Sequence, residues 1–78
     1  MRVYTLVGVD GNAFSIMGYT ARAMRNAKFT HEEIEQMQKE ATSGDYYNLI
    51  AVCDGYIDAV NERLGLDEYD EDEYDEDF

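Results

Sequence analysis

The segment from residue 46 to 64, YYNLIAVCDGYIDAVNERL, has the most regular apolar pattern in the chain. Its apolar side chains recur at steps of three and four residues, at Tyr46, Leu49, Ile50, Cys53, Ile57, Val60 and Leu64. This spacing puts them on one face of a helix. An apolar helix face must be covered by other elements. We therefore expect a helix over residues 46–64 at the centre of a small packed domain.

A helix is also predicted for the segment AFSIMGYTARAMRNA, which begins at Ala13. Asn12 directly precedes it and is a favoured N-cap residue. The apolar stripe that we expect to face the core consists of Phe14, Ile16, Met17, Ala21, Ala23 and Met24. Gly18 interrupts this segment and marks a position where another element can approach the backbone closely.

The segment FTHEEIEQM carries the clearest helix start in the sequence. Thr30 and Glu33 have the spacing of a capping box, and Phe29 and Ile34 have the spacing of a hydrophobic staple. We expect this helix to begin at about His31 and to lie on the surface, because only a narrow face is apolar. That face consists of Ile34, Met37 and Ala41.

Glycines mark the ends of the second and third predicted helices. Gly44 suits the position after the second helix, and Asp45 can cap the helix that follows. Gly65 followed by Leu66 fits a Schellman cap, in which Leu66 folds back onto the last helical turn. We therefore place the end of the folded domain at residue 65.

Residues 2–9, RVYTLVGV, are rich in β-branched and aromatic residues and are followed by the turn signal DGN. This composition predicts a strand. A buried strand needs hydrogen-bond partners, and no second strand is evident in the sequence. It could pair with its own copy in a homodimer, with a partner protein or with the tail. The expected fold is α+β and mostly α: one N-terminal strand, then three helices in residues 1–65, then an acidic C-terminal tail.

The tail, residues 66–78, holds most of the net charge. The chain has a formal net charge of −12; residues 67–78 contain nine acids and no bases, and residues 1–66 contain nine acids and six bases. A run of like charges is expected to be disordered unless bound. With few Lys and Arg, direct contact with nucleic acid or an anionic membrane is disfavoured, and the expected partner is a basic protein surface.

Aromatic residues interrupt the acidic tail at Tyr69, Tyr74 and Phe78. They cannot serve a core of their own, so we interpret them as anchors in shallow sites of a basic groove. The predicted partner-binding residues are Asp67, Glu68, Tyr69, Asp70, Glu71, Asp72, Glu73, Tyr74, Asp75, Glu76, Asp77 and Phe78.

The sequence does not indicate an enzyme. His31 and Cys53 are the single histidine and the single cysteine, and neither has a recognisable catalytic partner at a known spacing. The strand–turn–helix stretch VDGNAF lacks the glycine pattern and lysine of phosphate-binding loops. No cofactor or metal site is expected. We see no signal peptide or membrane span and expect a cytoplasmic protein.

The stretches LVGVDGNAFSIMGYTARAMR and THEEIEQMQKEATSGDYYNLIAVCDGYID resemble small uncharacterised acidic proteins of phages and mobile elements of Gram-positive bacteria. The resemblance covers about residues 6–61 and rests on VDGNAFS and ATSGDYYNLI. It implies a bacterial host and an anti-defence role, such as anti-CRISPR inhibition, and it brings no catalytic residues.

Two functions are therefore predicted from the sequence. The first is an inhibitor whose tail mimics nucleic acid and occupies the basic cleft of a nucleic-acid-binding protein, such as a CRISPR nuclease. The second is a small structural or regulatory protein-binding module that holds its partner through the helices or the strand edge. In that case the tail serves only solubility.

Overall fold

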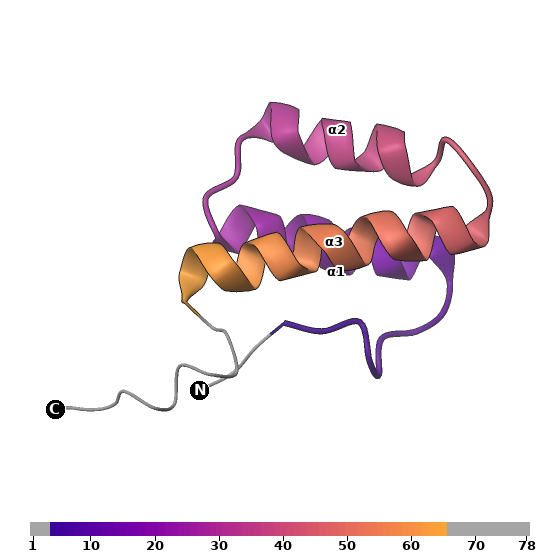
Figure 1. Cartoon of the computed structure of the whole chain (residues 1–78), viewed down its shortest axis with the longest axis horizontal. Coiled ribbons are helices and arrows are strands. Elements are labelled where there is room, and N and C mark those ends of the chain that lie inside the picture. Colours follow the sequence, from indigo (N-terminus) through magenta and orange to yellow (C-terminus); the bar gives the residue numbers. More distant parts are fainter. Residues whose placement is uncertain (1–3, 66–78) are drawn as a thin grey trace, which may run out of the picture.

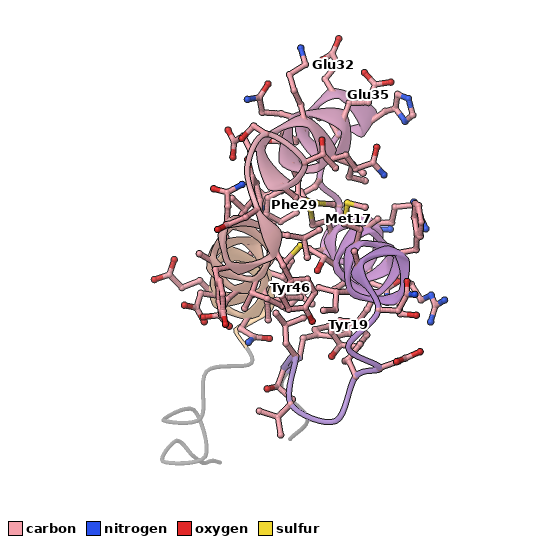
Figure 2. All side chains as sticks on the ribbon, turned by 90° about the vertical axis from the view of Figure 1, so that its right-hand side faces the viewer. Met17, Tyr19, Phe29, Glu32, Glu35 and Tyr46 are labelled. Atoms are coloured by element: carbon pink, nitrogen blue, oxygen red, sulfur yellow. The ribbon has the colours of Figure 1, made fainter. Side chains whose placement is uncertain are left out.

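The computed structural model describes residues 4–65, and these form a bundle of three helices (Figure 1). The helices are α1 (Ala13–Asn26), α2 (His31–Ala41) and α3 (Tyr46–Leu64). Short connections make neighbouring helices antiparallel, as expected for a small helical domain. In Figure 1, α3 lies in front of α1, and the view along the helices in Figure 2 shows that the two pack side by side. The helix α2 covers one side of this pair, and the N-terminal segment covers the other.

The expectation of an N-terminal strand is wrong, because residues 4–65 contain no strand and the fold is mostly helical rather than α+β. Instead, both backbone groups of Tyr4 form hydrogen bonds with the side chain of Asn61. The N–H of Tyr4 donates to Oδ1 (2.9 Å), and the C=O of Tyr4 accepts from Nδ2 (2.9 Å). The N–H of Thr5 donates to the hydroxyl of Tyr19 (3.0 Å). Side chains of the helices thus supply partners that a neighbouring strand would otherwise supply.

A turn then bends the segment away from an extended path. The N–H of Val9 donates to the carbonyl of Leu6 (3.1 Å), and Gly8 takes a φ of 87° at the third turn position. A type II turn requires positive φ there, which glycine adopts without strain. We call Tyr4–Gly11 the N-terminal strap. The β-branched residues of this segment favour a strand, but the turn and the hydrogen bonds to helix side chains outweigh that preference.

The predicted caps at the helix starts are confirmed. The side chain of Asn12 accepts the N–H of Phe14 (2.8 Å) at the start of α1. Thr30 and Glu33 form the complete capping box of α2. Asp45 accepts the N–H of Asn48 (2.9 Å) at the start of α3.

The end of α2 differs from the prediction. The helix ends at Ala41, and Gly44 does not occupy the position directly after the C-cap residue Thr42. The hydroxyls of Thr42 and Ser43 donate to carbonyls in the last turn instead. Asn48 adds a third donor, to the Glu40 carbonyl (2.9 Å). Side chains thus satisfy this helix end.

Lys28 forms an unusual Schellman motif at the end of α1. The N–H of Phe29 donates to the carbonyl of Met24, and that of Lys28 donates to the carbonyl of Arg25. This pattern puts Lys28 in the left-handed position, at a φ of 67°. The equivalent position after α3 is occupied by Gly65, at a φ of 70°, as the sequence predicts. Leu66 lies outside the described residues.

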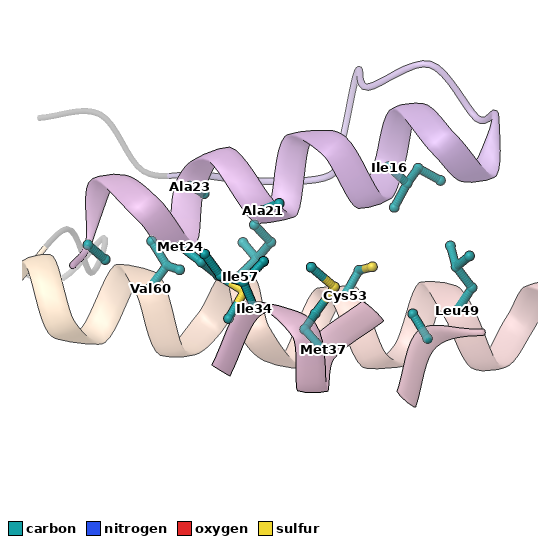
Figure 3. Packing of buried hydrophobic residues seen from close by; sticks show 12 residues of the cluster. Ile16, Ala21, Ala23, Met24, Ile34, Met37, Leu49, Cys53, Ile57 and Val60 are labelled. Carbon is teal, nitrogen blue, oxygen red and sulfur yellow. The ribbon is translucent and has the colours of Figure 1, made fainter. Parts of the chain in front are cut away.

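The core is filled mainly by small and flexible apolar side chains from all three helices (Figure 3). Its buried members are Ile16, Ala21, Ala23, Met24, Ala27, Ile34, Met37, Ala41, Leu49, Cys53, Ile57 and Val60. Thr20 is also fully buried, and its hydroxyl donates to the carbonyl of Ile16 (2.8 Å). The apolar faces predicted for α2 and the middle of α3 are confirmed. Three predicted core residues are exposed instead: Phe14 (79%) at the start of α1, and Tyr46 (46%) and Leu64 (38%) at the two ends of α3.

Candidate functional site

The predicted partner-binding residues, 67–78, lie outside the described residues. The structure describes the end of the bundle from which they extend. There, α3 ends at Leu64 and is capped by Gly65, and the guanidinium of Arg63 lies 3.8 Å from the centre of the Phe29 ring. This cation–π contact joins the last turn of α3 to the α1–α2 connection. The described part of the chain thus ends in a helix turn that is packed against the α1–α2 connection.

Charge is distributed unevenly over the three helices. The four acids of α2 are Glu32, Glu33, Glu35 and Glu40, and the three acids of α3 are Asp54, Asp58 and Glu62. By contrast, α1 contains no acid and two arginines. In Figure 2, Glu32 and Glu35 lie on the outer side of α2, away from α1 and α3. The acidic body is thus interrupted by one basic helix.

The exposed side of α1 combines positive charge with an aromatic ring. Phe14, Gly18, Arg22 and Arg25 follow one another at steps of four, four and three residues, and all are exposed. Such steps place them on one helix face. Among residues 4–65, no carboxylate forms an ion pair with either arginine, since the single ion pair in that range joins His31 and Glu35. We call these four residues the α1 basic face.

A shallow groove borders this face. It has a volume of about 450 Å³ and is lined by Phe14, Met17 and Gly18 of α1 and by Gln38, Lys39 and Thr42 at the end of α2. Figure 2 shows Met17 on the side of α1 that faces α2. The lining includes one base and no acid. The sequence placed Phe14 in the core; the missed signal is that it is only the second residue of α1, at an end of the bundle.

His31 and Cys53, the two residues weighed for catalysis, are separated by their environments. His31 is exposed on α2 and pairs with Glu35 (2.9 Å between Nε2 and Oε2). Cys53 is fully buried, and burial raises the pKa of its thiol above the usual range, although a hydrogen bond with Thr20 lowers it in part. A thiol that resists deprotonation is a poor nucleophile. The described residues also bring together no group of three metal-ligating side chains.

The start of α1, considered above as a phosphate loop, is occupied by its own side chains. Asp10 accepts the N–H of Asn12 (3.4 Å) and the hydroxyl of Ser15 (3.4 Å). Asn12 in turn accepts the N–H of Phe14. A carboxylate at this position disfavours an anion.

Most tyrosines of the body have structural partners. The rings of Tyr4 and Tyr19 pack edge to face, and the hydroxyl of Tyr46 donates to the carbonyl of Gly11. Tyr56 donates to Glu40 (3.1 Å). Burial and the carboxylates of Glu40 and Glu33 raise the pKa of Tyr56. Tyr47 packs its ring edge to face against Tyr46, but 80% of its surface is exposed.

The comparisons with known proteins add no relative: no family model, curated protein or solved structure matches the chain. None of the three helices is long and apolar enough to cross a membrane, as judged over the residues that the structure describes. The function must therefore be inferred from this chain's own charge and surfaces.

Proposed function

We propose that this chain is a non-enzymatic inhibitor that binds a basic, nucleic-acid-binding protein through its acidic tail. One observation carries the proposal: residues 67–78 hold nine carboxylates, three aromatic rings and no base. Such a segment matches the cleft of a nucleic-acid-binding protein, which is lined with Lys and Arg and with aromatic side chains that stack on bases.

The spacing of charge in the tail supports mimicry. An extended chain rises roughly 3.3 Å per residue, so nine charges over twelve residues give about one charge per 4.4 Å. One strand of DNA carries one phosphate per roughly 3.4 Å. The tail can therefore present negative charge at about three quarters of the density of one DNA strand. Tyr69, Tyr74 and Phe78 would then occupy the sites where bases stack.

The body supports the same role through its acidic helices. The exposed carboxylates of α2 and α3 add to the field of the tail, which strengthens long-range attraction to a basic protein at low salt. They also repel nucleic acid. The resemblance to phage proteins favours host-defence nucleases, such as CRISPR nucleases, as the target class and the bacterial cytoplasm as the place of action.

The test uses three full-length baits in a host lysate at low and high salt. The first is the natural chain. The second carries an amide in place of each of the nine tail carboxylates, and the third has Tyr69, Tyr74 and Phe78 replaced by Ser. We expect the natural chain to capture a nuclease and inhibit it at low salt, the neutral-tail variant to do neither, and the Ser variant to bind weakly. Full inhibition by the neutral-tail variant would refute mimicry.

The exposed ring of Phe14 beside the α1–α2 groove supports an alternative function. In this case the chain is a small regulatory module that holds its partner by apolar contact through the body, and the tail only keeps the chain soluble. A Phe14→Ser bait distinguishes the two. Loss of the captured protein with Phe14→Ser, together with its retention by the neutral-tail variant, would favour the module.

A further inference from the structure

We propose that, in the absence of a partner, the acidic tail docks on the α1 basic face of its own chain. The interaction surface consists of Phe14, Gly18, Arg22 and Arg25 with the adjoining groove, and its occupant is the segment 67–78. This goes beyond the proposed inhibition and does not depend on it, because it concerns the protein alone.

Charge complementarity is the first argument. The helix α1 contains no acid, and the groove beside it is lined by Lys39 and no acid. Every other helix of the bundle has an excess of acids. A segment with nine acids and no bases is therefore repelled by α2 and α3 and attracted by the C-terminal half of α1, which holds both arginines. The carboxylate of Asp10 lies beside Ser15, at the other end of this helix.

Reach is the second argument. Because the helices alternate in direction, α3 ends at the same end of the bundle as α1, and Arg25 lies in the last turn of α1 (Figure 1). The 14 residues of α1 span about 21 Å. Thirteen residues after Gly65 extend to about 43 Å. Packed helices lie about 8–10 Å apart, so the tail is long enough to cross from α3 and follow α1 to Phe14.

The order of charged and apolar side chains along α1 also fits the order of residues in the tail. A tail that starts beside Arg25 meets the two arginines first and the apolar groove at Phe14 and Met17 last. Its early carboxylates can therefore face the guanidiniums, and Tyr74 or Phe78 can reach the groove. Gly18 leaves room for this approach, since a Cβ atom placed there would have no neighbour within 4 Å. Tethering keeps the tail at high effective concentration, so weak individual contacts suffice.

Docking has a consequence for binding. A basic partner must compete with α1 for the tail, so removal of the two arginines should increase the affinity for a polycation. The tail is thereby kept from weakly basic surfaces and released to a strongly basic cleft.

The experiment compares backbone amide NMR spectra of full-length chains, without any partner, at about 20 mM and about 1 M salt, where the Debye length falls to about 3 Å. We expect amides of Gly18, Arg22 and Arg25 in the natural chain to shift between the two conditions. The shift should be lost in the neutral-tail variant and in the double variant Arg22→Glu with Arg25→Glu. Amides of Asp54 and Asp58 on α3 serve as the internal control.

Two matched variants sharpen the test. Gly18→Ala and Gly55→Ala each add one methyl group to an open helix position, but only the first lies on the α1 basic face. Docking predicts that Gly18→Ala alters the salt response of α1 and that Gly55→Ala does not.

Three results would overturn the proposal. One is a salt response of α1 that is identical in the natural and neutral-tail chains. Another is a response that grows with protein concentration, which would show that the tail binds a second copy. The third is equal effects of Gly18→Ala and Gly55→Ala.

Discussion

Replacement of Asn61 by Ala should destabilise the bundle, because this one side chain holds the N-terminal strap. Its amide accepts the N–H of Tyr4 and donates to the C=O of the same residue, both at 2.9 Å. A hydrogen bond of this kind contributes about 1 kcal/mol. Ala is a better helix former than Asn by roughly 0.6 kcal/mol, which offsets part of the loss. The expected decrease in the free energy of unfolding is therefore about 1.4 kcal/mol.

Urea unfolding followed by circular dichroism measures this change, and hydrogen exchange at the Tyr4 amide locates it. Asp58→Ala is the matched control, since it gives a similar gain in helix propensity on α3 at an exposed position. We expect Asp58→Ala to leave stability unchanged or slightly higher. If Asn61→Ala is as stable as Asp58→Ala, the paired hydrogen bonds do not stabilise the strap, and the explanation for the missing strand fails.

Other predictions concern backbone conformation and ionisation. Lys28→Gly should stabilise the bundle by about 1 kcal/mol in urea unfolding, because Lys28 has a positive φ that glycine adopts freely. Gly44→Ala should destabilise it by about 1 kcal/mol, since the new Cβ would lie 3.0 Å from Asn48, which caps α2; an unchanged midpoint would contradict this. Folding raises the pKa of Cys53 above 9.0, so the folded state keeps a proton that the unfolded chain loses. The contribution of Cys53 to the free energy of unfolding should be constant below pH 9 and decrease as the pH rises above 9. In Cys53→Ala, the free energy of unfolding should depend less on pH in this range. Tyr56→Phe should reduce the further decrease in the free energy of unfolding above pH 10, because the pKa of Tyr56 is also raised.

The helices could be predicted from sequence because their signals are local. Thr30 and Glu33 are three residues apart, and the apolar face of α3 repeats within each turn. The strand prediction failed for the opposite reason. Asn61, which binds the backbone of Tyr4, is 57 residues away in sequence, and no local pattern indicates such a pairing.

The surfaces were harder to predict than the helices. Periodicity assigned Phe14 to the core, although an apolar residue in the first turn of a helix can lie beyond the end of its neighbours. The separation of charge between α1 and the other two helices can be seen in the sequence once the helix bounds are known. The tail residues themselves are predicted from composition alone, and their role stays a prediction.

The pairing of Tyr4 with Asn61 also bears on how the protein is made. Translation proceeds at about 5–20 residues per second, so these two residues are synthesised roughly 3 to 11 s apart. Until α3 is complete, Tyr4 has its contacts with Tyr19 and Asn26 of α1 but lacks both hydrogen bonds to Asn61. The strap, at the start of the described chain, can therefore be fixed fully in place only after the end of α3 has been synthesised.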